Sequence, residues 1–220
     1  MPAKPGRILL VEGVEDREVV YQFCNYHSIN NRSLFDVEWK NGYESLRDDL
    51  MVRPLTDVQI IGAIVDADID PHGRWHSLRS VLLESGYTDF PTEPSDGGTI
   101  VSGMSGLPSI GIWLMPNNRV SGILEDFLAS LIQEGDVLLE RAVSCVDGIP
   151  LGQRKFRDTY RSKALIHTWL AWQEAPGTPL GLAVTKRYLD GDHALAQQFV
   201  QWLLRLFPTS WPHILVSSHP

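Results

Sequence analysis

The sequence lacks several features that define particular classes of protein. It holds two cysteines in 220 residues, Cys24 and Cys145, whose separation suits no metal-ligand spacing, so we expect two reduced core thiols. No apolar run approaches the roughly 20 residues that a membrane span needs. The N-terminal residues MPAKPGR lead into the first apolar segment without the hydrophobic region of a signal peptide. These absences predict a cytoplasmic protein with no membrane-spanning segment.

An excess of positive charge is also missing. The chain has 19 Lys and Arg residues against 27 Asp and Glu, a formal net charge of −8. Overall electrostatic attraction therefore cannot hold nucleic acid, because that affinity comes from phosphates neutralised by cations. A partner of this kind would require a local basic surface, a bound metal cation, or both.

The sequence alternates between short apolar runs, typical of buried strands, and apolar residues at helical spacing. Apolar runs predict strands at residues 7–11, 34–39, 58–65 and 110–115. Apolar residues at i, i+3 and i+4 predict helices that begin near residues 15, 43, 74 and 121, and further helices at 156–173 and 192–207. Strands that alternate with helices favour a mainly parallel sheet with right-handed crossovers. We therefore expect an α/β domain over residues 1–150, with a helical extension over residues 151–220 packed on it.

Acidic residues follow two of these predicted strands. Glu12 comes directly after the first, and Asp66 and Asp68 come after the third. The carboxyl ends of strands are where open α/β sheets bind ligands. In extended chain the two aspartates would point to one face. Carboxylates gathered in this way suit Mg²⁺ or Mn²⁺, and without a cation their repulsion raises at least one pKa. Each acid alone is compatible with an ordinary turn, but their joint placement favours a metal site.

Three segments resemble a known family. Residues 8–13 (ILLVEG), followed by an acid-led helix, resemble the first Toprim motif, and residues 65–68 (VDAD) resemble the Asp-x-Asp of topoisomerases, primases and the overcoming-lysogenisation-defect nucleases. Residues 111–118, which lead into residues 122–126, are similar to the corresponding part of an uncharacterised bacterial and archaeal Toprim-like family. The resemblance covers about residues 7–130, and more weakly the chain through Lys163 and beyond. It implies a Rossmann-like Toprim fold.

The resemblance also implies roles for individual acids. Glu12 would act as general acid or base, while Asp66 and Asp68 would hold the metal ion. Asp70 and Glu125 are further candidate ligands. The implied cofactor is Mg²⁺ or Mn²⁺.

A basic segment at residues 153–163 answers the requirement for local positive charge. Five of its eleven residues are Arg or Lys, and they alternate with Phe156 and Tyr160. Cations neutralise phosphates and aromatic rings stack on unpaired bases, although a solvated helix face over two core aromatics fits the pattern equally well. Lys163 resembles a lysine of related nucleases and would stabilise charge at the scissile phosphate. The remaining cations are the candidate substrate-binding residues: Arg154, Lys155, Arg157 and Arg161.

Other motifs fit less well. His72 and His76 have the i, i+4 spacing of zinc-binding pairs, but no third ligand is evident, so a polar helix face is favoured. A response-regulator receiver needs a second acid where Gly13 stands. A phosphatase of the haloacid-dehalogenase kind needs Thr or Val where Asp70 stands.

The function expected from these patterns is Mg²⁺- or Mn²⁺-dependent phosphodiester chemistry on nucleic acid, of a nuclease-like kind. The alternative is a non-catalytic module that binds nucleic acid or a protein partner such as an ATPase, for instance in phage defence. DNA and RNA are equally compatible with the sequence, and the oligomeric state stays open.

Overall fold

A computed structural model describes residues 6–52, 58–104 and 106–209 and contains a five-stranded sheet of order β2-β1-β3-β5-β4. Strands β1, β2, β3 and β5 run parallel to their neighbours, whereas β4 is an edge strand that pairs with β5 in the antiparallel direction. The expected α/β architecture with a mainly parallel sheet is therefore confirmed. The strands are β1 (Arg7–Val11), β2 (Asp36–Trp39), β3 (Ile60–Asp66), β4 (Thr99–Val101) and β5 (Ser109–Met115).

Helices connect the strands and continue after them. Those between strands are α1 (Val14–Tyr26), α2 (Asn31–Leu34), α3 (Tyr43–Val52) and α4 (Pro71–Glu84). Those after β5 are α5 (Leu124–Ala129), α6 (Val137–Asp147), the 3-10 turn η1 (Asp158–Tyr160), α7 (Arg161–Leu170), α8 (Leu180–Thr185) and α9 (Ala194–Leu206).

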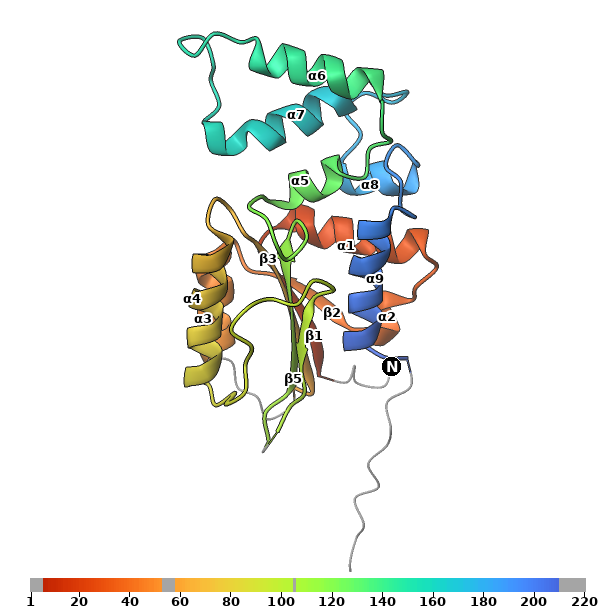
Figure 1. The fold of residues 1–220 in the computed structure, drawn as a ribbon. Helices are drawn as coiled ribbons and strands as arrows, with labels where there is room; N and C mark the ends of the chain where they lie inside the picture. The colour runs from red at the N-terminus through yellow and green to blue at the C-terminus, as the bar shows by residue number, and fades with distance from the viewer. Residues whose placement is uncertain (1–5, 53–57, 105, 210–220) are drawn as a thin grey trace, which may run out of the picture.

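The central strands are apolar throughout because helices cover both faces of the sheet. In β3, Ile61, Ala63 and Val65 belong to the core under α3 and α4. Ile60 and Ile64 belong to the core under α1 and α9 on the other face (Figure 1). A strand buried on both sides reads as a continuous hydrophobic run, which is the pattern seen in the sequence.

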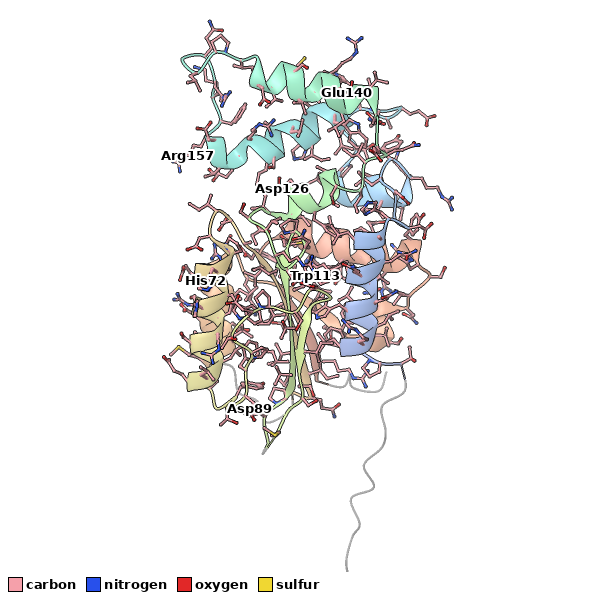
Figure 2. The ribbon with its side chains drawn as sticks, viewed as in Figure 1. His72, Asp89, Trp113, Asp126, Glu140 and Arg157 are labelled. Atoms are coloured by element: carbon pink, nitrogen blue, oxygen red, sulfur yellow. The ribbon has the colours of Figure 1, made fainter. Side chains whose placement is uncertain are left out.

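Two glycines let α9 approach the sheet closely. A Cβ added to Gly111 would lie 2.5 Å from Leu206 Cδ2, and one added to Gly62 would lie 2.7 Å from Leu9 Cδ1 and 3.0 Å from the same Leu206 atom. Trp113 of β5 packs against Phe199 and Trp202 of α9, at ring-centroid distances of 5.3 and 5.8 Å (Figure 2). The C-terminal helix therefore completes the core of the α/β part.

Helices α6 and α7 pair above the carboxyl end of the sheet, and α7 also contacts α5 (Figure 1). The boundary expected near residue 150 falls between these two paired helices. The helix expected over residues 156–173 is shorter, because the chain first forms η1 and α7 begins at Arg161. Cys24 is buried as expected, but Cys145 is exposed on α6, so the expectation of a core thiol is wrong there.

Within the described ranges, no helix has both the length and the apolar composition that crossing a bilayer requires.

Candidate functional site

Glu12 and Asp66 lie side by side at the carboxyl edge of the sheet. They follow β1 and end β3, two neighbouring parallel strands in which Val11 pairs with Ile64. The backbone N–H of Asp66 donates to Glu12 Oε1 at 2.9 Å. The Asp66 carboxylate in turn accepts the N–H of Leu124 through Oδ1 at 3.0 Å. The first turn of α5 is thereby held against the end of β3.

Burial makes ionisation of these two carboxylates unfavourable. It raises the pKa of Glu12 to about 7, with a further contribution from Asp16, despite the hydrogen bond from the Asp66 backbone. The pKa of Asp66 is raised well above its usual range, first by burial and then by repulsion from Glu12, Asp16 and Glu125. Several carboxylates therefore lie within electrostatic range of one another.

Asp16 is a member of this group that the sequence interpretation missed. It is the third residue of α1, and its Oδ2 accepts the N–H of Gly13 at 3.0 Å. Burial raises its pKa to about 6 in spite of its backbone hydrogen bonds, and Glu125 adds repulsion. The acid three residues after Gly13 is the local signal of a helix cap. Its position next to the other carboxylates has no local signal.

Glu125 reaches the same region from α5, where its side chain is 0% exposed. Its Oε1 forms an ion pair with Lys163 Nζ from α7, and its buried Oε2 has no hydrogen-bond partner. Burial disfavours the charged form of Lys163, but attraction to Glu125, Glu15 and Asp66 outweighs it, so the Lys163 pKa is raised. An internal cation thus partly compensates the acidic group.

A hydrogen bond of Asp126 connects α5 to α7 next to this ion pair. Its Oδ2 accepts the N–H of Ile123 at 2.9 Å, and its Oδ1 accepts the Ser162 hydroxyl at 2.5 Å. Figure 2 shows Asp126 on α5 below α7. Because Ser162 directly precedes Lys163, this contact also fixes where the lysine enters the acidic region.

Asp68 does not continue the extended conformation that the alternation argument assumed. Its φ is +52°, and its backbone forms an antiparallel bridge with Gly122 through hydrogen bonds of 2.9 and 2.7 Å. The exposed carboxylate forms an ion pair with Arg74, whose guanidinium lies 3.7 Å from the ring centroid of Tyr43. Strand periodicity therefore does not set the direction of the Asp68 side chain, because the chain turns after Ala67, but Asp66 and Asp68 still line a common cleft.

The other candidate ligand, Asp70, is the N-cap of α4. Its Oδ1 accepts the N–H of Gly73 at 2.9 Å. A Cβ at Gly73 would lie 2.3 Å from Asp70 Oδ2, so the cap also depends on the glycine. The described contacts of this carboxylate are those of a helix cap.

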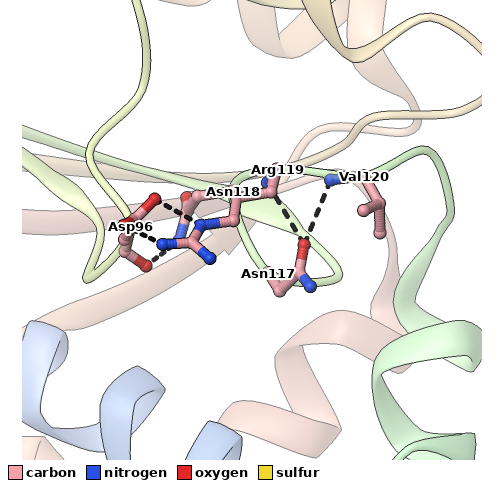
Figure 3. Close-up of polar contacts among 5 residues, drawn as sticks. All are labelled: Asp96, Asn117, Asn118, Arg119 and Val120. Atoms are coloured by element: carbon pink, nitrogen blue, oxygen red, sulfur yellow. Dashed lines mark hydrogen bonds and ion pairs between the residues drawn. The ribbon is translucent and has the colours of Figure 1, made fainter.

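The loop between β5 and α5 is fixed by polar contacts (Figure 3). Asn118 accepts the N–H of Leu114 at 2.8 Å and donates to the Asp96 carbonyl at 3.3 Å. Arg119 forms an ion pair with the Asp96 carboxylate, and Asn117 Oδ1 accepts two backbone N–H groups of its own turn at 3.1 Å. This loop leads into the segment that carries Gly122 and Glu125.

Two clefts meet at Asp66 and Lys163, which line both. The larger, of about 690 Å³, lies between the end of β3, the loop at residues 121–123 and the start of α7. The smaller, of about 430 Å³, lies between the start of α1 and residues 39–42 and contains Glu12 and Asp16. Asp66 therefore borders both clefts, whereas the buried Glu125 lines neither.

Two cations of the basic segment at residues 153–163 form internal ion pairs, and two others do not. Arg154 forms an ion pair with Asp158 at 2.8 Å, and Arg161 binds both oxygens of Asp147 at 2.7 Å. Lys155 and Arg157 are exposed and make no ion pair with any residue the structure describes. Arg157 lies at the tip of the pair formed by α6 and α7 (Figure 2).

His72 and His76 lie on α4, with ring centroids 4.3 Å apart, and His72 Nε2 is 3.4 Å from Glu93 Oε1. Across residues 6–52, 58–104 and 106–209, no group of three or more His, Cys, Asp or Glu side chains is arranged to hold a metal ion.

Comparison with known proteins gives a family but no described activity. No curated protein matches the chain, and no solved structure does. A family model described as "Protein of unknown function (DUF3226)" matches residues 6–208. Since this match spans most of the sequence, the chain belongs to that family.

Proposed function

We propose that this protein binds Mg²⁺ or Mn²⁺ through Asp66, Glu125 and Glu12 and performs phosphodiester chemistry on nucleic acid. The observation that carries this proposal is the fully buried Glu125, whose Oε2 has no hydrogen-bond partner, beside an Asp66 carboxyl with a strongly raised pKa. Unpaired buried carboxylate oxygens are costly, and a divalent cation would offset that cost.

The donor set fits such an ion in its chemistry, but in the described structure the three carboxylates are not gathered around one position, so an ion would have to draw them together. Carboxylate oxygens are the ligands that Mg²⁺ and Mn²⁺ prefer. Asp68 could join the set if its carboxylate exchanged Arg74 for the ion, since its charge already contributes to the raised pKa values of Glu12 and Asp66. Asp70 is left out of this proposal, because its carboxylate caps α4.

The side chains around the ion have distinct proposed roles. When bound, the ion supplies positive charge to a phosphate. In the metal-free site Glu12 has a pKa of about 7, and a bound cation would lower it, so Glu12 would act as the general base in its charged form. Lys163 Nζ lies in the wall of both clefts and can donate to a phosphate oxygen.

The same features support the Toprim assignment. A mainly parallel sheet brings Glu12 and Asp66 to adjacent strand ends, the position at which α/β proteins bind ligands. The segments at residues 8–13 and 65–68 that resemble Toprim motifs supply these two acids. We propose on this basis that the fold is of the Toprim type.

Calorimetric titration with Mn²⁺ and a plasmid-nicking assay test the proposal together. The parent protein should bind Mn²⁺ and convert supercoiled DNA, or cleave RNA, whereas Asp66→Asn and Glu125→Gln should lose both properties. Asp89→Asn is the matched control, because Asp89 is an exposed acid at the opposite end of the sheet (Figure 2). Equal Mn²⁺ binding by all four proteins would exclude this site.

A non-catalytic binding module remains a second candidate, because Arg154 and Arg161 are occupied by internal acids and the chain carries a net charge of −8. Metal binding at Asp66 without cleavage of any single- or double-stranded DNA or RNA would favour this candidate.

A further inference from the structure

Each of the two clefts beside the acidic group contains an exposed aromatic side chain. Trp39, the last residue of β2, is 45% exposed and lines the smaller cleft. Tyr160, the last residue of η1, is 47% exposed and lines the larger one. Each ring therefore lines a cleft that Asp66 and Lys163 also line.

Exposed aliphatic residues accompany both rings. Val14 lines the cleft of Trp39, and Ile69 lines the cleft of Tyr160. Neither aromatic ring is buried in the core clusters, so their apolar surface is available to a ligand. A base has a flat apolar face that such a side chain can cover.

The charge of the cleft walls restricts what the ligand can be. Glu12, Glu15 and Asp16 line the smaller cleft. The acids of the larger one include Asp68, Asp126 and Asp158. These walls repel the phosphates of any nucleic acid except at Lys163, so a duplex, which is held mainly through its backbone, fits less well than a strand held through its bases. Stacking of unpaired bases on aromatic rings does not need a basic surface, and it contributes about 1–3 kcal/mol per base.

We propose that the two clefts form one groove for single-stranded nucleic acid. One base stacks on Trp39 and another stacks on Tyr160, and a phosphate between them lies at Lys163, the cation that lines both clefts. The position of the phosphate rests on the proposed metal-dependent function, whereas the two stacking contacts do not require cleavage.

Fluorescence anisotropy with labelled oligothymidylate and oligouridylate, in Ca²⁺ to limit cleavage, tests the groove. Trp39→Ala and Tyr160→Ala should each weaken binding about 5-fold to 100-fold. Trp39→Phe and Tyr160→Phe should retain most of the affinity, because a ring remains available for stacking. Both positions are exposed, so the melting temperatures should stay close to that of the parent.

Trp172→Ala is the matched control. Trp172 is 41% exposed, lies two residues after the end of α7, and does not line either cleft. Its replacement should leave the affinity unchanged. A labelled hairpin duplex should bind the parent more weakly than the single strands do.

The groove is refuted if the duplex binds as tightly as the single strands, or if either alanine variant binds like Trp172→Ala. These results are separable from failure of the proposed chemistry. Loss of affinity in both alanine variants, with no effect of Asp66→Asn on Mn²⁺ binding, would support the groove and reject the metal site. Normal metal-dependent cleavage by both alanine variants, with unchanged binding, would reject the groove alone.

Discussion

Lys163 supplies the cation that pairs with the fully buried carboxylate of Glu125. The lysine side chain is 41% exposed, whereas that of Glu125 is 0% exposed. The cation therefore extends from the surface of α7 into a region where Asp66, Asp16 and Glu12 also gather. This pairing joins the helical pair α6–α7 to the acidic end of the sheet.

Removal of that cation should destabilise the protein. Lys163→Met leaves Glu125 buried without a counter-charge, and we expect the free energy of unfolding to fall by about 2–4 kcal/mol. Urea denaturation in chelator measures the change. Adding Glu125→Gln to the same chain should recover most of the loss, because the uncompensated charge is then gone. If Lys163→Met alone were as stable as the parent, the role assigned to Lys163 would be contradicted.

Neutralisation of Asp66 should have the opposite effect in the absence of metal. Asp66→Asn keeps an oxygen that can accept the Leu124 N–H, and it removes repulsion with Glu12, Asp16 and Glu125. We expect about 1–2 kcal/mol of added stability in chelator, together with loss of the stabilisation that Mn²⁺ gives the parent. Thermal melts with and without Mn²⁺ measure both. A lower melting temperature in chelator would show that the repulsion is unimportant.

The stability of the metal-free protein should fall as pH rises from about 4.5 to about 7. Glu12 and Asp16 have folded-state pKa values of about 7 and about 6, above their ordinary 4.5 and 3.8. Between the two sets of values the folded state binds more protons than the unfolded state, so raising the pH favours unfolding. Above about pH 7 the contribution of Glu12 and Asp16 is lost, and Asp66, whose pKa is also raised, adds to the fall in the same direction. Urea titrations at several pH values give the free energy of unfolding as a function of pH. Glu12→Gln should make this pH dependence less steep. With saturating Mn²⁺, the added free energy of unfolding relative to the metal-free protein should grow between about pH 4.5 and about pH 7.

Asp70 should contribute to stability and not to metal affinity. Its carboxylate caps α4 through Gly73 N–H, so Asp70→Ala should cost about 1 kcal/mol. Calorimetry should give the same Mn²⁺ affinity for this variant and the parent. Asp70→Asn, which retains a capping oxygen, should be nearly as stable as the parent. A large loss of Mn²⁺ affinity in both variants would return Asp70 to the set of ligands.

Much of the sheet could be predicted from the sequence because burial leaves a local pattern. Strands β1, β3 and β5 are covered on both faces and read as continuous apolar runs, and the turn after each run places Glu12 and Asp66 at a strand end. Strand β4 escaped notice, since three residues at an antiparallel edge carry too short a pattern. Nor does the pattern delimit α2, α6 or α8.

The sequence by itself therefore determined the α/β class and which acids end the central strands, since both follow from residue order within one strand and its turn. Only the tertiary structure decided which other charges reach them. Asp68 leaves the extended conformation at a backbone bridge to Gly122, which is 54 positions later in the chain, and its carboxylate pairs with Arg74. Lys163 meets Glu125 because α7 packs on α5, and Trp39 and Tyr160 each line a cleft that Asp66 also lines. Such contacts depend on how helices pack across the edge of the sheet, and no periodicity within a segment encodes them.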